Sequence, residues 1–243
     1  MNKPYVVCYM MNSLDGRIKG DYFTTERGAA YRGKYADLHV KQVKKAWMCG
    51  TNTMIDLADE KVDLPKEPTG ISRADYIADT NAEYYAVSID PLGELAWKSN
   101  VIEHGFNSLD TKRTGNQIIE ILTAQAPDAY LTYLQNRKIS YIISGEENIC
   151  FAEVFDKLYN IFGIDHLLLE GGGFLNSSVI REDLIDEYSV LMIATVDAGP
   201  IAVTSFAPPQ SLPKMTPFDF YVKSVEKVDN TGLWMTFTRK EVN

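Results

Sequence analysis

The sequence has few basic residues: 24 Lys and Arg stand against 33 Asp and Glu, which gives a formal net charge of −9 at pH 7. A surface that binds nucleic acid needs a basic field to neutralise phosphates, so this balance argues against a nucleic-acid partner. It is still compatible with a small anionic ligand in a local pocket.

Long apolar runs are also absent, because the longest extends only from Tyr5 to Met11. A membrane-spanning helix needs about 20 apolar residues, so we expect neither such a helix nor a membrane partner. Asn12-Ser13-Leu14-Asp15 interrupts the run, which argues against a secretory signal. A hydrophobic fraction of 45% excludes a disordered chain and indicates a globular protein.

Cysteine is scarce. Cys8, Cys49 and Cys150 lie far apart in the sequence and form neither a zinc-binding pair nor an evident disulfide framework. We therefore expect reduced core thiols in a cytoplasmic protein.

Histidine is equally scarce, with only His39, His104 and His166. They form no helical metal-binding pair, so we expect no metal. No Ser-His-acid or Cys-His relay can be assembled from them either, and His166 at the start of an expected strand favours a structural role. Nucleophilic catalysis therefore has little support.

Hydrophobic patterning predicts alternating strands and helices. Expected strands cover 5–11, 46–49, 84–89, 97–103, 139–143, 166–169, 187–195, 219–228 and 233–239, and expected helices cover 27–45, 51–58, 117–124, 128–137, 151–162 and 174–181. The polar stretch 59–81 is expected to be a loop. The pattern indicates one α/β domain over 1–243, with a mixed, mostly parallel sheet flanked by helices and a C-terminal antiparallel hairpin.

Three glycines, Gly171, Gly172 and Gly173, follow the expected strand 166–169 and precede a helix. Such a junction presents unpaired N–H groups at the positive end of the helix dipole, and glycines let an anion approach them. A phosphate or pyrophosphate would fit there. The spacing is neither Gly-x-Gly-x-x-Gly, because residue 176 is Asn, nor a P-loop. The alternative is a tight turn with close helix–sheet packing.

Glu170 ends the same strand, at the sheet edge where ligands of open α/β sheets bind. There its carboxylate can accept hydrogen bonds from an N–H-rich heterocycle. The alternative is that it satisfies the amides of the turn.

Other strand ends carry weaker signals of the same kind. Gly50 to Thr53 and Ser144–Gly145 each follow an expected strand, where helix capping without a ligand is the commoner explanation. Asn12 to Gly16 follows the first strand. Asp15 could orient a substrate amine, although Asp before Gly is more often simple turn chemistry.

Together these residues resemble the reductase domain of bacterial riboflavin biosynthesis, a member of the dihydrofolate-reductase-like superfamily. The resemblance covers about residues 4–239. It rests on Ser13-Leu-Asp-Gly-Arg17, Gly50-x-x-Thr53, Asp90, Leu-Leu-Glu170-Gly-Gly-Gly173 and Leu184-Ile-Asp-Glu187.

The resemblance implies an NADPH-dependent reductase, most like 5-amino-6-(5-phosphoribosylamino)uracil reductase, and a cytoplasmic homodimer acting on a small molecule. Implied cofactor-binding residues are Met11 (through its backbone), Thr53, Asp56, Asp90, Ser144, Gly145, Gly171, Gly172, Gly173, Phe174, Leu175 and Asn176. Implied substrate-binding residues are Asn12, Ser13, Asp15, Lys41 as a candidate for the ribose phosphate, and Glu170, which is also the catalytic candidate.

The sequence also departs from the family. It lacks the His-x-Glu and Pro-Cys-x-x-Cys signatures of the zinc deaminase found in the bifunctional proteins. Stretch 59–81 replaces the usual Asp-x-Pro segment, and the phosphate-binding base has no sure counterpart. Two alternatives therefore stay open: a reductase of dihydrofolate or another pterin, and a non-catalytic NADP-binding protein of the same fold.

Overall fold

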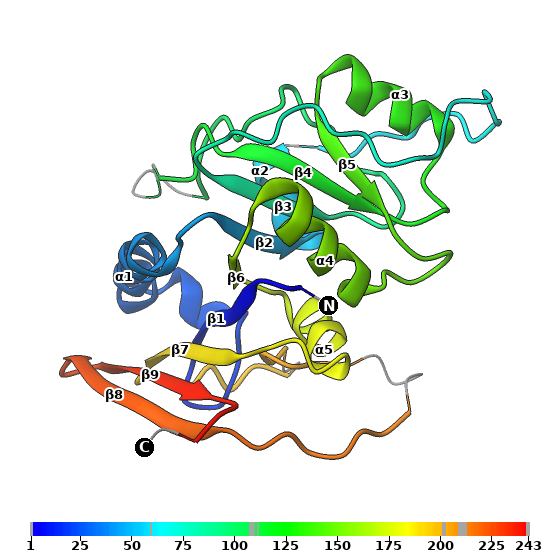
Figure 1. Cartoon of the computed structure of the whole chain (residues 1–243). Coiled ribbons are helices and arrows are strands. Elements are labelled where there is room, and N and C mark those ends of the chain that lie inside the picture. The colour runs from blue at the N-terminus through cyan, green and yellow to red at the C-terminus, as the bar shows by residue number, and fades with distance from the viewer. Residues whose placement is uncertain are drawn as a thin grey trace. The chain divides into compact units, whose positions relative to one another are not determined.

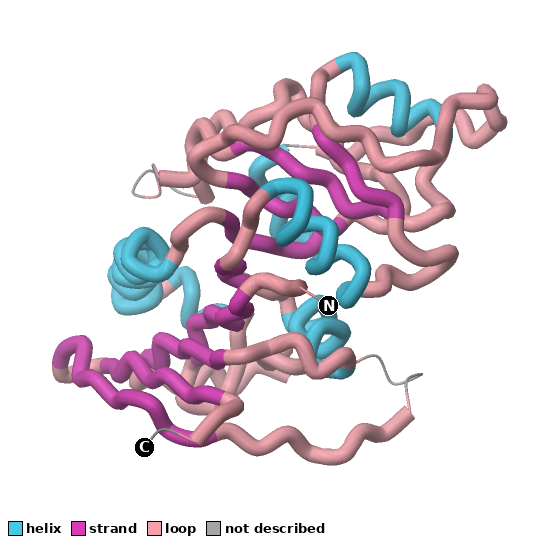
Figure 2. Tube along the Cα trace, in the orientation of Figure 1, coloured by secondary structure: helices cyan, strands magenta, loops and turns pink. Residues whose placement is uncertain are grey.

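The computed structural model describes residues 2–58, 60–106, 110, 112–200, 203–208 and 213–241 (Figures 1 and 2). The chain divides into two compact units, each built from separate stretches of sequence. Unit 1 comprises 1–4 and 44–167, and unit 2 comprises 5–43 and 168–243. The single domain over 1–243 stays a prediction.

Unit 1 contains four parallel strands in the order β5-β4-β3-β2. Its elements are β2 (Ala46–Gly50), α2 (Thr51–Ala58), β3 (Tyr85–Ile89), β4 (Gln117–Leu122), α3 (Asp128–Asn136), β5 (Ser140–Ile143) and α4 (Phe151–Phe162). Every residue of β3 and β4 is buried. Strands covered on both faces need continuous apolar sequence, which explains the absence of polar alternation along them.

Strand β4 corrects the predicted helix over 117–124. Ile118, Ile119 and Ile121 are β-branched and fit a pleated strand, while complete burial removes the alternation by which a strand is recognised. The predicted strand over 97–103 was also wrong, because only Val101 forms an isolated bridge there. The predicted loop over 59–81 has no helix or regular strand within its described residues 60–81; residue 59 lies outside the described residues.

Unit 2 contains β1 paired in parallel with β7, and β9 antiparallel to both β7 and β8. Its elements are β1 (Tyr5–Asn12), η1 (Asp21–Thr24), α1 (Glu26–Gln42), α5 (Gly173–Arg181), β7 (Glu187–Ile193), β8 (Tyr221–Asp229) and β9 (Gly232–Thr238). Strand β6 (His166–Leu169) begins in unit 1 and ends in unit 2. The predicted C-terminal hairpin is confirmed, and Figure 1 shows β8 and β9 as its two strands.

Helix α1 begins where the sequence offers a cap. The Thr25 side chain accepts a hydrogen bond from the N–H of Gly28, which satisfies one of the unpaired amides of the first turn. The helix ends at Gln42 rather than at the predicted residue 45, because Val43 is extended. Gly28 cannot carry a side chain, since a Cβ there would lie 2.0 Å from the Tyr22 carbonyl oxygen.

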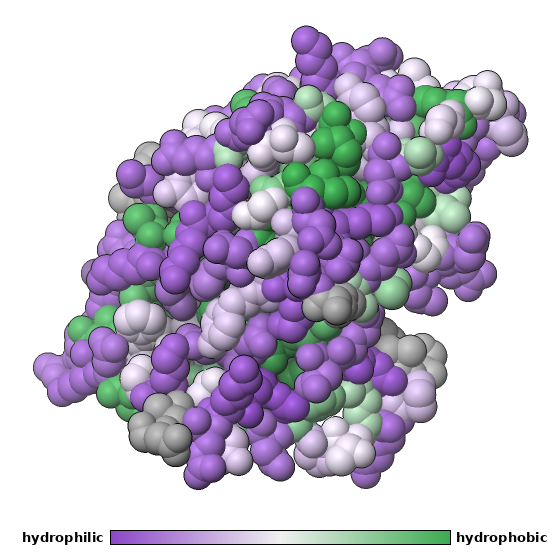
Figure 3. Space-filling view, in the orientation of Figure 1, coloured by the Kyte–Doolittle hydropathy of each residue, from purple (hydrophilic) through white to green (hydrophobic). Residues whose placement is uncertain are grey.

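The α/β class with mostly parallel pairing is confirmed. Among the described residues, no helix combines the length and apolar character needed to cross a membrane, and the face seen in Figure 3 is largely hydrophilic. None of the three cysteines forms a disulfide. Cys8 and Cys49 are buried as expected, but Cys150 is exposed just before α4, so it is not a core thiol.

Two acidic side chains meet inside unit 1. The Tyr130 hydroxyl oxygen lies 3.3 Å from Asp90 Oδ2, 3.2 Å from Glu120 Oε1 and 2.9 Å from the Leu95 carbonyl oxygen, so its one proton is shared among three acceptors. Trp97 Nε1 donates to the same Glu120 oxygen at 2.8 Å. Glu120 Oε2 and Asp90 Oδ1 have no partner among the described residues. Burial, and then the charge of Asp90, raise the pKa of Glu120 well above its usual value.

Glu120→Gln should change how stability depends on pH. Because the folded-state pKa of Glu120 is raised, its ionisation costs stability as pH rises above the ordinary carboxyl value of about 4.3, by about 1.4 kcal/mol per pKa unit. Gln keeps the acceptor for Trp97 and Tyr130 and cannot ionise. Urea unfolding from pH 4.5 to 8.5 should show the variant gaining stability relative to wild type as pH rises, with exposed Glu226→Gln as control. Parallel pH profiles for Glu120→Gln and wild type would contradict the assignment.

Candidate functional site

The turn between β6 and α5 has two crowded glycines and one open glycine. Gly171 has φ +86°, and a Cβ there would lie 3.0 Å from Met10 Cε. At Gly173 a Cβ would lie 2.3 Å from the Thr204 carbonyl oxygen, whereas at Gly172 it would meet nothing within 4 Å. Gly171 is therefore required by its left-handed φ and Gly173 by packing against the backbone, whereas Gly172 faces open space; the peptide between Gly171 and Gly172 is cis.

The N-terminus of α5 presents backbone donors at this turn. Gly172 is the N-cap and supplies no side-chain cap, and the first amides of a helix have no intrahelical acceptor. The predicted cofactor-binding residues of α5 differ in exposure: Phe174 is 61% exposed, whereas Leu175 and Asn176 are buried. The open face at Gly172, the uncapped amides and the helix dipole together fit a diphosphate group.

Asn176 joins a polar network that holds the segment 203–208. Its Nδ2 donates to the Ser205 carbonyl oxygen at 2.8 Å. The Ser205 hydroxyl donates to Asn12 Oδ1 at 2.8 Å and accepts from the Tyr188 hydroxyl at 2.9 Å. Burial raises the pKa of Tyr188, which keeps its hydroxyl protonated. The network brings the predicted residues Asn12 and Asn176 to one place, and Met11 lies buried beside it in β1.

Asp15 is occupied by contacts within unit 2. Its Oδ1 accepts from the Ser13 hydroxyl at 2.6 Å and from the N–H of Asp197 at 3.1 Å, and its Oδ2 pairs with Arg17 Nε at 2.7 Å. The Ser13 hydroxyl, and then the N–H groups of Asp197 and Ala198, lower the pKa of the Asp15 carboxyl. This pattern joins two loops, so it favours the turn role over orientation of a substrate amine.

Glu170 is buried and paired with a histidine. Its side chain is 2% exposed, and its Oε1 lies 3.1 Å from Nδ1 of His39, whose side chain is 1% exposed. Lys41, two positions further along α1, is exposed. Residues two apart in a helix do not face the same side, so Lys41 is directed away from the His39 side of α1.

The remaining predicted residues lie in unit 1. Thr53 and Asp56 are in α2, and Asp56 is exposed. Asp90 is buried, and its Oδ2 accepts from the N–H groups of Glu94 and Leu95 at 2.6 and 2.9 Å. These contacts close the turn after β3, and cofactor binding by all three stays a prediction.

Ser144 and Gly145 form a tight turn at the end of β5. The Ser144 hydroxyl donates to Glu153 Oε2 at 2.8 Å. Gly145 has φ +74°, and a Cβ there would lie 1.9 Å from the Asn148 carbonyl oxygen. The glycine is thus required by the turn itself, and its role at a cofactor site also stays a prediction.

Sequence reasoning missed His39, Tyr188 and Ser205. A signal for His39 existed, because it lies four and eight positions after Tyr35 and Tyr31 on the buried side of α1. Ser205 lies outside any helix or regular strand, so no periodicity could have singled it out.

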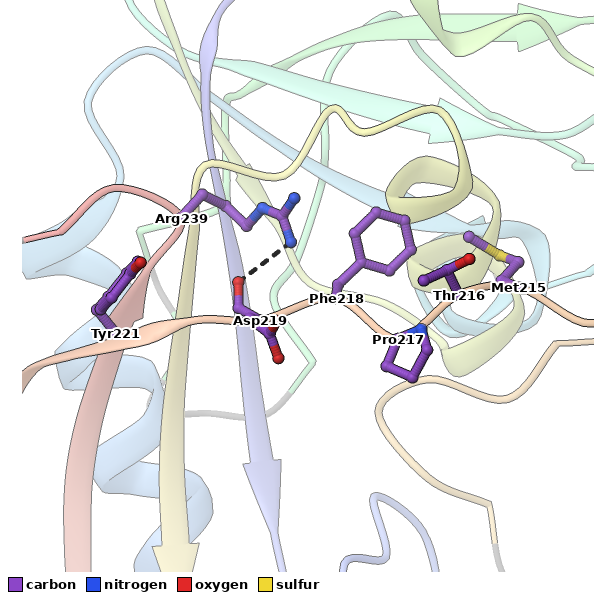
Figure 4. Close-up of a pocket in the computed structure, with 7 residues that line it drawn as sticks. All are labelled: Met215, Thr216, Pro217, Phe218, Asp219, Tyr221 and Arg239. Carbon is purple, nitrogen blue, oxygen red and sulfur yellow. Dashed lines mark hydrogen bonds between the residues drawn. The ribbon is translucent and has the colours of Figure 1, made fainter.

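Unit 2 also has an open cavity of about 560 Å³ (Figure 4). The guanidinium carbon of Arg239 lies over the Phe218 ring, 4.9 Å from its centroid. The guanidinium group donates to the Asp219 carbonyl oxygen and to Asp183 Oδ1. None of the predicted site residues lines this cavity. Among the described residues, no group of three or more His, Cys, Asp or Glu side chains could hold a metal ion.

Comparisons with known proteins give one family and several structures. The family model of the RibD C-terminal domain matches residues 4–222. A search of curated proteins finds no match. The solved structures that resemble this chain share 13–20% of its sequence, so their similarity shows a shared fold.

The chain is similar to a pyrimidine reductase-like protein of Corynebacterium diphtheriae, with TM-score 0.67, 13% identity and coverage of 98% of this chain and 92% of that one. It is also similar to Acinetobacter baumannii RibD, with TM-score 0.61, 20% identity and coverage of 97% of this chain but only 58% of the RibD chain. The riboflavin biosynthesis reductase Rib7 of Saccharomyces cerevisiae gives TM-score 0.58 and 16% identity, over 97% of this chain and 90% of that one. With the family model matching most of its length, this chain belongs to the RibD C-terminal domain family.

Proposed function

We propose that this protein is an NADPH-dependent reductase of a phosphoribosylaminopyrimidine, most like 5-amino-6-(5-phosphoribosylamino)uracil. The observation that carries the proposal is the glycine turn, where Gly172 opens on free space at the uncapped N-terminus of α5. Membership of the RibD C-terminal domain family supports a reductase; one similar structure is named as a pyrimidine reductase-like protein and another as a riboflavin biosynthesis reductase.

In unit 2, the glycine turn and the start of α5 bind the cofactor. The first amides of α5 hold the cofactor's diphosphate, because no side chain caps them, Gly172 opens on free space beside them, and the helix dipole favours an anion there. The left-handed φ of Gly171 and the close approach of Gly173 to the Thr204 carbonyl oxygen fix the path of the turn. When bound, NADPH supplies the hydride, so this chain needs position and electrostatics rather than a nucleophile.

Glu170 supplies the acceptor for the heterocycle. An aminopyrimidine presents N–H donors, and a carboxylate is an acceptor of matching polarity. Glu170 directly precedes the glycine turn, so in this proposal adjacent residues of one chain segment bind the substrate and the cofactor. Orientation of two reactants can contribute about 7–11 kcal/mol to lowering a barrier, which suits a site without a catalytic relay.

Purified protein should oxidise NADPH, followed by its absorbance, when 5-amino-6-(5-phosphoribosylamino)uracil is added. A carboxylate acceptor and an anion-binding turn fit this substrate and cofactor. Dihydrofolate and a dihydropterin serve as comparison substrates. Turnover confined to the pterins would replace the proposed substrate class, and tight NADPH binding with no oxidation by any compound would favour a non-catalytic NADP-binding protein.

Gly172→Ala should weaken NADPH binding by about tenfold or more, which corresponds to at least about 1.4 kcal/mol. Its φ of −75° tolerates a side chain and no atom obstructs a Cβ, so the cost in folding stability should stay near 1 kcal/mol. Calorimetric titration with NADPH measures the affinity and urea unfolding the stability. Ser178→Ala on the same helix is the control. An unchanged Kd for NADPH in Gly172→Ala would contradict binding of the diphosphate at this turn.

We also expect a cytoplasmic homodimer. Among the described strands, β8 pairs only with β9, and its residues Tyr221, Val222 and Val225 are 47%, 61% and 57% exposed. An exposed apolar edge strand is prone to pair with another chain. Sedimentation equilibrium should therefore give a dimer mass, and Val222→Lys with Val225→Lys should shift the protein toward monomer. A monomeric wild type would contradict this expectation.

A further inference from the structure

Helix α1 delivers one polar side chain into the buried interior beside the glycine turn. His39 lies in its last turn, and its side chain is 1% exposed. Nδ1 of His39 lies 3.1 Å from Oε1 of Glu170, whose side chain is 2% exposed, although the two residues are 131 positions apart in the sequence. Both residues belong to unit 2.

Burial makes this contact more than a surface ion pair. A carboxylate removed from water is costly unless it is hydrogen-bonded to a donor. A neutral imidazole can donate from one ring nitrogen, and the orientation of a ring is often set by such a bond to a carboxylate. The bond therefore restricts the rotation of both side chains.

We propose that His39 is a positioning residue for Glu170: its Nδ1–H donates to Oε1 and fixes the plane of the carboxylate, which then accepts N–H donors of an amino-substituted heterocycle. The inference rests on the proposed function. It adds that a residue of α1, through its hydrogen bond to Oε1, sets the orientation in which the Glu170 carboxylate accepts the substrate's N–H donors.

The proposal predicts an unusual behaviour of Glu170→Gln. With His39 present, the Gln carbonyl oxygen takes the Nδ1–H, so the amide NH2 group occupies the other oxygen's position and meets substrate N–H donors with its own hydrogens. Removing the His39 donor removes the interaction that favours this orientation of the amide, so its carbonyl oxygen can face the substrate instead. The second substitution should therefore partly repair the first.

Steady-state kinetics with 5-amino-6-(5-phosphoribosylamino)uracil tests this prediction. We expect kcat/KM to fall about 100-fold in Glu170→Gln and in His39→Leu, as misplacement of a binding group by about 1 Å can do. His39→Asn keeps an N–H donor near the Nδ1 position and should stay within about tenfold of wild type, and the double variant His39→Leu/Glu170→Gln should recover about tenfold over Glu170→Gln.

Two controls separate positioning from folding. NADPH affinity should change less than about twofold in all variants, and exposed His104→Leu should match wild type in every measurement. The double variant has no buried charge left at residue 170, so it stays informative if His39→Leu alone fails to fold. Full activity in folded His39→Leu, or a double variant worse than Glu170→Gln, would overturn the proposal.

A second test, NMR spectroscopy of the His39 ring, needs no substrate. The chain has only three histidines, so selective 15N labelling resolves the His39 ring. We expect a protonated Nδ1 whose proton exchanges slowly and shifts upfield in Glu170→Gln, because a charge-assisted hydrogen bond becomes a neutral one. An unprotonated Nδ1, or a signal unchanged in the variant, would overturn the proposal.

The two arms also separate this inference from the proposed function. If wild-type protein oxidises NADPH with none of the heterocycles, the proposed function fails, and the ring signal alone decides whether His39 donates to Glu170. If turnover occurs but the kinetic pattern of the variants is additive, the reductase stands and the positioning role fails.

Discussion

A Cβ atom at Gly173 would lie 2.3 Å from the Thr204 carbonyl oxygen, and one at Gly171 would lie 3.0 Å from the Met10 side chain. This close approach of backbone and side chain around the turn brings β1, α5 and the segment after residue 203 together in unit 2. It sets the direction in which α5 begins and thus the direction of its first amides. It also leaves Gly172 as the one member of the turn that faces open space.

Polar side chains buried around this turn form hydrogen-bonded pairs and networks. Asn176 Nδ2, Ser205, Asn12 and Tyr188 are linked by hydrogen bonds, while Glu170 contacts His39. Each group would be costly to bury alone. Sharing hydrogen bonds offsets that cost and also fixes side-chain orientation, which a binding site for a cofactor and a heterocycle requires.

Local sequence was sufficient to predict most of the helices and strands. The helix over 151–162 was predicted with its observed bounds, because its apolar residues repeat at helical spacing and Gly163 ends it in the left-handed conformation. Strand β4 was mistaken for a helix, because its burial on both faces removes the alternation that distinguishes the two. Cys150 was placed in the core, although spacing alone carries no information on exposure.

By itself, the sequence determined the α/β alternation, the C-terminal hairpin and the glycine turn after Glu170, since each depends on residues close together in the chain. Only the tertiary structure decided that Gly172 is the open one of the three glycines in the turn, that Asp15 joins two loops, and that His39 contacts Glu170. The physical reason is distance along the chain. A hydrogen bond between residues 131 positions apart leaves no local signature, because it exists only after packing has brought helix and strand together.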